Sequence, residues 1–510
     1  MAATLDQLLP VAADRTKRQA MVDAHFPPNP PAGFEGNWRG TADTTGFTTI
    51  TCASADALAT EMNNAGPADR LVLECAWNGI TTSGQRMFGY ISSQLVANGA
   101  VDWGYDRPAA EILVRPAAGF SPVYQSTYSN GVIDLVGFSK LTFENMEFEA
   151  SSLVFNITAT YPGLAMVAVK GCTFRNSTGS NTGVIRLGNV RVLHIENNDF
   201  IDCDAGFIGG ANFVRSWNNR FRGLADNDVH GLRGALYGSW TTHAWVAGNI
   251  AWDMSGRKPT SGLHCDFLQT SHPNDSHVGY EVLAECNIFH LNRPSSSPGT
   301  QGFFGDDGSG YKGDWLVHNN LGMIGAYHGF SGWDPNDNED KVFTKNMLLR
   351  QANPNANQDA YPWVQGARFA TGTGSLTVRD NYAAAFNTGR VNGESFTNNV
   401  VVSPRVGATA GTRYQDVLTG NGSWGTDPNT GYLTFVSPDA GVADAATART
   451  AIANFAKPLA GWESNGVGPV DPLQWPQNID WSTLGSGGGG GGTNAPSLPG
   501  NALLLNVSVL

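Results

Sequence analysis

The sequence predicts an all-β fold, a parallel β-helix solenoid with a helix capping its N-terminal end and a non-repetitive C-terminal region. Two observations predict it. Charged residues make up only 15% of the 510 residues, whereas glycine (62) and asparagine (43) are abundant. An average domain has about 25% charged residues and about 7% glycine, so this composition is typical of a turn-rich β protein. The second observation is a short motif that recurs along the chain.

The motif is an apolar strand, an asparagine, one further residue and an apolar residue. Its aligned copies share one column, in which the last eight members are asparagine: Met146, Cys172, Asn198, Asn219, Asn249, Asn287, Asn320, Asn346, Asn381 and Asn399. Stacked coils bury a continuous core that no coil could bury alone. Strands stack at about 4.8 Å, so the column becomes a ladder of amides that bond from coil to coil. The alternative is a β-sandwich with asparagine-marked turns, which does not explain ten copies in phase.

The segment before the repeats, residues 47–80, reads as strand, helix, turn and strand. Ser54 can cap the helix, and Gly66 with Pro67 ends it. One helical face collects the apolar residues Ala55, Leu58, Ala59 and Met62. Here the chain resembles the right-handed parallel β-helix, or pectate-lyase-like, superfamily over about residues 45–405. The resemblance implies that this helix plugs the open end of the coil.

Four regions follow from these patterns. We expect an N-terminal attachment or linker segment (1–44, with a short helix in 3–24), the capped β-helix (45–405), a C-terminal region that closes the helix (406–484), and a Gly-rich linker with an apolar tail (485–510). An apolar tail of this kind would aggregate alone, so it should pair with another chain or fold back.

The net charge of −13 and the isoelectric point near 5.2 argue against nucleic acid and an anionic membrane as partners. They leave an anionic polysaccharide open, through a local basic patch. No apolar run approaches 18 residues, and no cleavable signal peptide is seen. An extracellular location would therefore need lysis, a dedicated secretion system or a virus particle. The six cysteines contain no C-x-x-C pair, which favours buried reduced thiols over zinc and leaves a Cys52–Cys75 bridge open.

A second column of strands lies upstream of the ladder. We expect its inward row to contain Ile185, Phe207, Leu236, Phe267, Phe303, Phe330 and Phe369. Because strand side chains alternate between faces, the polar residues at odd offsets from this row should point outward. This rule predicts one vertical file of Asp204, Arg233 and His264, with Asp266 beside His264 and Asp306 on the same strip.

The expected catalytic residues of this strip are His264, Asp266, Asp306 and Arg233, and two reactions are open. A hydrolase needs two carboxyl groups, which Asp266 with Asp306 or Asp307 would supply. A lyase needs a base and a cation beside a uronate carboxyl, which His264, Lys312 or Arg233 would supply. The segment SGLHCDFLQ (261–269) resembles superfamily motifs in which His and Asp flank a strand and face the sugar.

The substrate-binding candidates combine polar groups with flat rings that suit sugar faces: Asp204, Gln269, Tyr237, Trp240, Trp333 and Lys312. Asp228 and His230 are secondary candidates. No metal ligand is assigned, although Asp306, Asp307 and Asp314 keep calcium (Ca2+) open. The alternative is that these residues form ordinary surface ion pairs and loop contacts.

Three functions compete at this stage. The first is a bacteriophage tail-spike-like homotrimer, which docks to the virion through its N-terminal segment and binds and cleaves a surface polysaccharide. The second is a bacterial polysaccharide lyase or glycoside hydrolase. The third is a non-enzymatic adhesin or structural surface protein.

Overall fold

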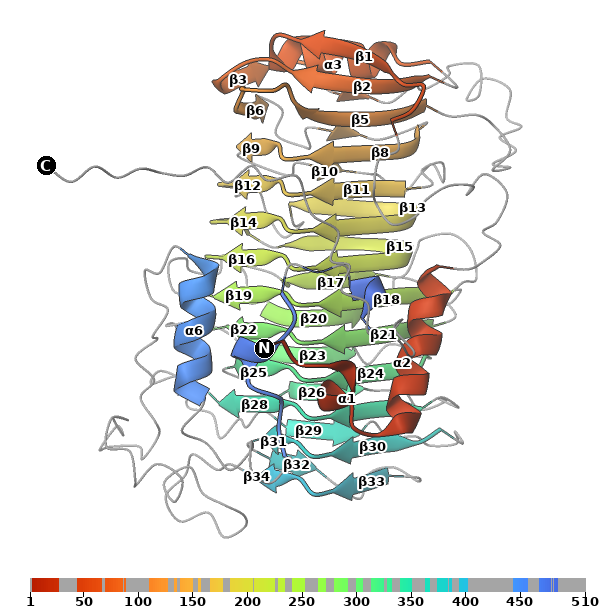
Figure 1. Ribbon diagram of the computed structural model, residues 1–510, viewed down its shortest axis with the longest axis vertical. Coiled ribbons are helices and arrows are strands. Elements are labelled where there is room, and N and C mark those ends of the chain that lie inside the picture. Colours follow the sequence, from red (N-terminus) through yellow and green to blue (C-terminus); the bar gives the residue numbers. More distant parts are fainter. Residues whose placement is uncertain are drawn as a thin grey trace, which may run out of the picture.

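The chain forms a right-handed parallel β-helix with three sides, as seen in a computed structural model (Figure 1). The structure describes residues 2–26, 44–66, 69–85, 87–88, 110–126, 133–134, 138–149, 155–156, 166–177, 184–204, 206–224, 228–233, 241–252, 265–271, 279–291, 300–305, 313–324, 328–332, 340–350, 363–366, 374–383, 385–387, 394–401, 444–456, 467–477, 479 and 481–484. Every strand pairing between these residues is parallel, and each strand pairs with the equivalent strand of the next coil. The predicted all-β solenoid is therefore confirmed.

The sides are here called strips one, two and three. Strip one contains β1 (Thr48–Cys52), β2 (Arg70–Cys75), β5 (Ala110–Pro116), β8 (Phe138–Glu144), β11 (Met166–Lys170), β13 (Ile185–Glu196), β15 (Phe207–Trp217), β18 (Thr241–Ala247), β21 (Gly279–Glu285), β24 (Trp315–His318), β27 (Lys341–Thr344), β30 (Leu376–Arg379) and β33 (Glu394–Thr397).

Strip two is the 12-stranded sheet of β3 (Gly79–Ser83), β6 (Pro122–Ser126), β9 (Glu147–Glu149), β12 (Thr173–Arg175), β14 (Asp199–Ile201), β16 (Arg220–Arg222), β19 (Ile250–Trp252), β22 (Ile288–His290), β25 (Leu321–Ile324), β28 (Met347–Arg350), β31 (Tyr382–Ala383) and β34 (Val400–Val401).

Strip three contains β4 (Met87–Phe88), β7 (Ile133–Asp134), β10 (Phe155–Asn156), the first residues of β13 and β15, β17 (His230–Arg233), β20 (Cys265–Ser271), β23 (Thr300–Gly305), β26 (His328–Gly332), β29 (Trp363–Gly366) and β32 (Ala385–Asn387). Because β13 and β15 continue around the corner, strips one and three form one 22-stranded sheet.

The predicted asparagine ladder is present, and it lies at the corner between strips one and two. From Asn198 to Asn399, each side-chain Nδ2 donates to the Oδ1 of the next asparagine at 2.8–3.1 Å. Each Oδ1 also accepts from the backbone N–H of the preceding ladder residue, beginning with Cys172 at 2.9 Å. The residue before each ladder position has a φ between 50° and 66°, which turns the chain into strip two.

Inside the coil, equivalent side chains stack from one coil to the next. In strip two the rings of Phe148, Phe174, Phe200 and Phe221 follow one another at centroid distances of 5.3, 5.0 and 4.6 Å. Apolar side chains of all three strips join them in one continuous core. A single coil cannot bury its own apolar side chains and is not stable alone. The stack is stable because each coil covers the apolar side chains of the next.

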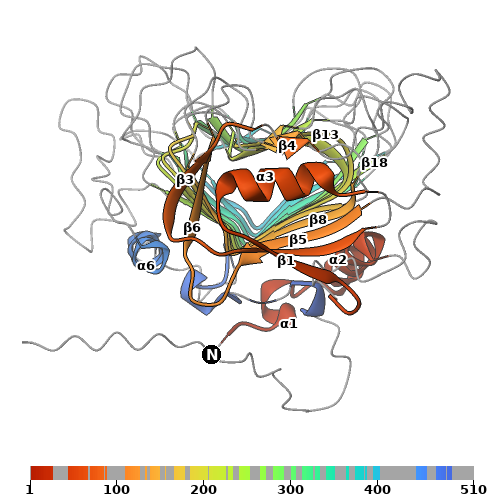
Figure 2. The same cartoon turned by 90° about the horizontal axis from the view of Figure 1, so that it is seen from above.

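The helix α3 (Ala55–Asn64) plugs the N-terminal end of the coil, as expected from the sequence. Its residues Ala55, Leu58, Ala59 and Met62 are fully buried. The Ser54 hydroxyl accepts a hydrogen bond from the backbone of Ala57 at 3.2 Å. Figure 2 shows this helix lying across the mouth of the coil.

Both ends of the chain pack against the outside of the coils. The expected N-terminal helix is broken at Pro10 into α1 (Leu5–Leu8) and α2 (Ala12–His25), and these cover strip one rather than standing apart as a linker. The helix α6 (Ala445–Ala456) and the short helices η3 (Pro472–Gln474) and η4 (Trp481–Thr483) lie along the side of the coils, not over their open end (Figure 1).

Five cysteines lie among the described side chains, and all five are buried free thiols. Cys52 and Cys75 are register partners of β1 and β2 but form no bridge. Burial raises the pKa of Cys52 to about 11 and that of Cys172 to about 12, so these thiols stay protonated. The expected role as small apolar core residues is confirmed for them.

No helix within the described residues is long and apolar enough to cross a membrane.

Candidate functional site

Strip three lies across the coil from the terminal helices (Figure 2). Register partners run through it in one row: Phe155, Ile185, Phe207, His230, Leu268, Phe303, Phe330, Val364 and Phe386. The described side chains of this row, such as Phe303 and Phe330, are fully buried. The row is thus the inward one.

This row corrects the one expected from the sequence at three places. His230, Leu268 and Val364 occupy the positions that we had assigned to Leu236, Phe267 and Phe369. Phe267 is nevertheless inward as expected, because its ring stacks on Phe289 of the core at a centroid distance of 4.3 Å. Phe267 and Leu268 are both fully buried, so strict alternation fails at this place. The strand that we expected at 235–240 lies outside the described residues, and β17 at His230–Arg233 takes its place.

Two buried aspartates occupy equivalent positions of adjacent coils at the entry to strip three. Asp228 and Asp266 each stand two residues before a row member, His230 and Leu268, and these two are register partners. Asp228 is 4% exposed and Asp266 is fully buried. The backbone N–H of Asp266 donates to Asp228 Oδ1 at 3.0 Å, and Val229 N–H donates to the carbonyl of Asp266 at 2.8 Å. The backbone thus holds the two residues side by side.

A glutamine extends this pair to a third coil. Gln301 is the register partner of Asp266, is 6% exposed, and its Oε1 has no hydrogen-bond partner in the described part of the chain. Three oxygen-bearing side chains therefore follow one another along the axis. Buried carboxyl and amide groups are uncommon unless they are bonded or serve a site.

The next file of register partners lies one residue further along each strand. The register partners here are Asn156, Arg186, Ile208, Gly231, Gln269, Phe304, Ser331, Gln365 and Asn387. Gln269 and Phe304 are neighbours in this file, and both side chains are partly exposed. An amide beside an aromatic ring can bond to and stack on one small polar ligand.

His230 connects the aspartate pair to the core. Its Nδ1 lies 2.9 Å from the carbonyl oxygen of Phe267, and its Nε2 lies 2.9 Å from the hydroxyl of Ser216. A carbonyl only accepts, so Nδ1 carries the proton and Nε2 accepts from Ser216. Burial lowers the pKa of His230 to about 3, so the ring stays neutral at ordinary pH. It holds β20 in place next to Asp266.

The structure separates the residues that we expected in one vertical file. Arg233 follows the row and is the register partner of Ser271, whereas Asp204 precedes the row, with its N–H bonded to Ser177 O at 2.9 Å. Asp204 and Arg233 thus stand on opposite sides of the row. Asp266 is fully buried, so it does not lie on the exposed surface where we expected it.

Several predicted site residues lie outside the described residues: His264, Asp306, Asp307, Tyr237, Trp240, Trp333 and Lys312. Of the remaining candidates, Gln269 lies on the strip as expected. Gln301 and Phe304 were missed. Their signal was the segment TQGFFG, which aligns Gln301 with Asp266 once Leu268 is placed in the row.

The expected calcium ligand Asp314 is engaged elsewhere. Its carboxylate bonds to Lys17 at 2.5 Å and to the N–H of Asp340 at 2.9 Å, on the side of strip one. Among the described side chains, no group of three His, Cys, Asp or Glu residues could hold a metal ion. Asp228, Asp266 and Gln301 supply the hard oxygen donors that calcium prefers, and only two of them are acidic.

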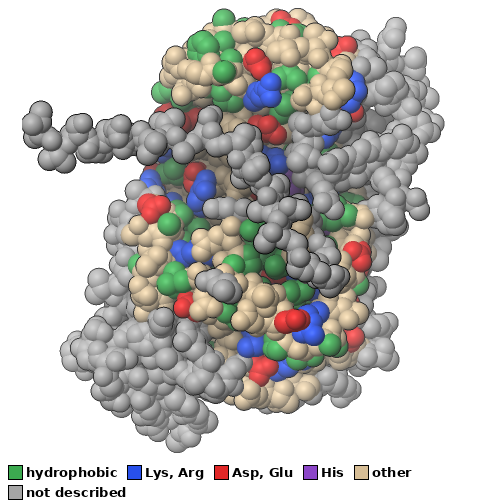
Figure 3. Space-filling model, viewed as in Figure 1, with side chains coloured by type: hydrophobic (Ala, Val, Ile, Leu, Met, Phe, Trp, Pro, Cys, Tyr) green, Lys and Arg blue, Asp and Glu red, His purple; other side chains and the backbone are tan. Residues whose placement is uncertain are grey.

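The face that carries the terminal segments is the one seen in Figure 3. Its charged side chains of both signs are scattered among apolar and polar ones and do not gather into one field (Figure 3). This face is occupied by contacts within the chain, which leaves strip three as the better candidate site.

The sequence matches no known protein family and no curated protein. Among solved structures, the chain is similar to an alginate lyase from Paenibacillus sp. strain FPU-7, with 15% identity and a TM-score of 0.25, over 68% of this chain and 99% of that one. It is also similar to the PL6 family alginate lyase AlyGC, with 11% identity and a TM-score of 0.26, over 76% and 55% of the two chains. At these TM-scores, the function has to be argued from the residues of the chain.

Proposed function

We propose that the protein cleaves an extended polysaccharide that binds along strip three, with Asp228 and Asp266 as the reacting pair. The pair itself is the observation that supports this proposal: two buried aspartates in equivalent positions of adjacent coils. Beside them, the partly exposed Gln269 and Phe304 offer an amide and a ring to a sugar. A long, repetitive surface also suits a repetitive polymer.

The pair suits hydrolysis, which needs one carboxylic acid to protonate the leaving oxygen and one carboxylate on the anomeric carbon or on a water. Adjacent coils are about 4.8 Å apart. Retaining enzymes hold their carboxyl groups about 5–5.5 Å apart, and inverting enzymes hold them farther apart. Hydrolysis by this pair should therefore retain the configuration at the anomeric carbon.

Elimination is the second candidate, and Gln301 is the observation that favours it. Asp228, Asp266 and Gln301 fit a hard cation by their donor set. Bound there, a cation would neutralise the carboxyl of a uronate, which acidifies the neighbouring proton. This candidate requires an acidic polysaccharide, whereas hydrolysis does not.

The test is incubation of the full chain with neutral and acidic polysaccharides, alginate included, followed by new reducing ends and by the ultraviolet absorbance of unsaturated sugars. Reducing ends alone indicate hydrolysis, and both signals together indicate elimination. Asp228→Asn and Asp266→Asn should each lower turnover at least about 100-fold. Asp23→Asn is the control, since Asp23 is exposed on α2 and its carboxylate bonds only to Gln19 in the described contacts. Unchanged turnover in Asp266→Asn would exclude the pair.

The biological setting stays a prediction. A tail-spike-like protein should be a detergent-resistant trimer, whereas a free lyase or hydrolase need not be. If the full chain binds a polysaccharide but releases no product from it, the adhesin function replaces the enzymatic one.

A further inference from the structure

The N-terminal segment (residues 2–26) and the C-terminal segment (residues 467–484), here called the two ends, meet on strip one and on the corner beside it. We propose that they form one cooperative clamp: α2 and the segment 467–484 stay docked only together, and together they make the coils from β15 to β30 unfold as one unit. The clamp lies across the coil from strip three, so this inference does not depend on the proposed function.

The helix α2 fastens coils that are not neighbours. Near its start Asp14 pairs with Arg379 of β30, and near its middle Arg18 pairs with Glu285 of β21. At its end, the carbonyl oxygen of His25 accepts a hydrogen bond from an Arg215 guanidinium nitrogen of β15 at 2.7 Å. The helix rises about 1.5 Å per residue and neighbouring coils are about 4.8 Å apart, so the 14 residues of α2 run past several coils.

The C-terminal segment runs along the corner and contacts the residues with positive φ. The N–H of Gly468 donates to the carbonyl of Asp380 at 2.6 Å, and the N–H of Val470 donates to Asn319 Oδ1 at 3.0 Å. Three coil positions further toward the N-terminal end, Trp481 Nε1 donates to Asn218 Oδ1 at 2.9 Å. The segment therefore also spans several coils. As its residue numbers rise, it passes them in reverse order, from the coil of β30 to that of β15.

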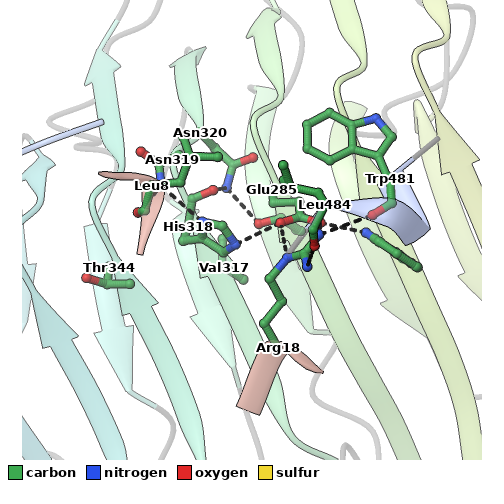
Figure 4. A network of polar contacts seen from close by, with 12 residues as sticks. Leu8, Arg18, Glu285, Val317, His318, Asn319, Asn320, Thr344, Trp481 and Leu484 are labelled. Carbon is green, nitrogen blue, oxygen red and sulfur yellow. Dashed lines mark hydrogen bonds and ion pairs between the residues drawn. The ribbon is translucent and has the colours of Figure 1, made fainter. Parts of the chain in front are cut away.

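Arg18 of α2 bonds both to the Glu285 carboxylate of the coil and to the C-terminal end (Figure 4). Its Nε and Nη2 donate to the two oxygens of Glu285 at 2.7 and 2.9 Å, while Nη1 donates to the carbonyl of Leu484 at 2.7 Å. Nη2 also lies 3.4 Å from the carbonyl oxygen of Trp481. The Arg18 and Glu285 side chains are 1% and 0% exposed, so neither is solvated if the other leaves.

Asn319 joins the two ends a second time. Its Nδ2 donates to the carbonyl of Leu8 at 2.6 Å, while its Oδ1 accepts from Val470. A third link runs directly from Ala3 N–H to the carbonyl of Gln474 at 2.7 Å. The two ends also share one apolar cluster with the coils: Leu8, Leu9, Met21 and Val22 from the first, Val467, Trp475 and Trp481 from the second. Undocking one end thus removes hydrogen-bond partners and apolar cover from the other.

The consequence concerns cooperativity. A solenoid is stabilised mainly by contacts between neighbouring coils and can lose its coils one after another. Links between non-neighbouring coils oppose this stepwise loss, because no clamped coil can open without breaking contacts of the whole clamp.

The test is amide hydrogen exchange of the full chain, read separately in α2 and in residues 467–484. Gly248→Ala disturbs the docking of Trp481 and does not touch α2: Gly248 has a φ of +66°, and a Cβ there would lie 2.7 Å from the Trp481 ring and 2.6 Å from Asn218 Oδ1, the acceptor of Trp481. Asp14→Asn disturbs the N-terminal end alone, because the Asp14 carboxylate pairs with Arg379 and contacts no described residue of 467–484. We expect each variant to raise exchange at least tenfold in both ends.

Gly119→Ala is the matched control, since Gly119 also has a positive φ (+84°) but no atom within 4 Å of an added Cβ. It should leave exchange in both ends unchanged. Faster exchange confined to the mutated end would overturn the clamp, and so would separate unfolding of the β15 and β30 coils in the parent protein. If Gly248→Ala does not fold, Asp14→Asn alone decides, because its predicted effect on residues 467–484 is the same.

Discussion

Each ladder asparagine uses both ends of its side chain. Asn287 Oδ1 accepts from the backbone and the side chain of Asn249, each at 3.0 Å, and its Nδ2 donates to Val246 O and Asn320 Oδ1. No other side chain of this size supplies two donors and an acceptor at the same place. The column could be predicted from the sequence because this demand recurs in every coil.

Asn287→Ala should therefore destabilise the protein strongly. It removes four hydrogen bonds and leaves the N–H of Asn249 buried without its acceptor, so we expect a loss of about 3 kcal/mol in the free energy of unfolding. Urea denaturation measures it. The control is Asn64→Ala at the exposed end of α3, which should change little. A loss below about 1 kcal/mol for Asn287→Ala would show that the ladder is not a major source of stability.

His230 should make the stability depend on pH. Its folded pKa, about 3, lies below the unfolded value near 6.5, so the unfolded chain binds the proton first as the pH falls. The contribution of His230 to stability is complete above pH 6.5 and decreases by about 1.4 kcal/mol per pH unit down to about pH 3. His230→Gln should show a shallower slope over this range, as measured by urea denaturation at several pH values. An unchanged slope would contradict this assignment, and the partly exposed His243, changed to Gln, is the control.

At the scale of elements, the sequence predicted those parts whose pattern is long or strongly constrained. The capping helix has a four-residue apolar face and a serine cap, and its place was predicted correctly. The strands of strip three are short and contain polar inward residues such as His230, so their register could not be fixed. Phe267 and Leu268 both lie in the core, so strict alternation fails there and could not show that Asp266 is buried.

The plug formed by α3 can be tested by a cavity. Leu58 is fully buried between the helix and the first coils, so Leu58→Ala should cost about 3 kcal/mol. Thermal and urea unfolding measure this cost, and Thr60→Ala on the exposed side of the helix is the control. If both variants unfold alike, α3 does not seal the core.

At the scale of the whole molecule, the outer surfaces of the N-terminal coils carry ion pairs that run from coil to coil. Arg175 meets Glu147 at 2.6 Å, Arg220 meets Asp199 at 2.5 Å, and Arg115 meets Glu74 at 2.8 Å. Such exposed pairs contribute little to stability. They give the outer faces there a polar, charge-balanced surface, whereas the coils from β15 onward are covered by the chain's own ends.

The sequence could not predict this cover. The segment 1–44 is proline-rich near its end and reads as a linker, and its contacts lie hundreds of residues away, as between Arg18 and Glu285. Burial alone would raise the pKa of Glu285, but the charge of Arg18, together with His318, lowers it to about 2. A pairing between residues so far apart in the chain leaves no recognisable pattern in the sequence around either of them.

The oligomeric state tests the tail-spike setting. The expected outcome for that setting is a trimer that survives detergent, as measured by sedimentation and native mass determination of the full chain. A monomer at all protein concentrations would contradict the tail-spike prediction while leaving a monomeric polysaccharide-cleaving enzyme unaffected.

The most direct test of the central claim is product analysis after incubation of the full chain with a panel of neutral and acidic polysaccharides. We expect at least one polysaccharide to be shortened. Asp266→Asn should release at least about 100-fold less product, and the Asp23→Asn control should be unaffected. Cleavage that proceeds equally in Asp266→Asn and Asp228→Asn, or binding along strip three without any product, would contradict it.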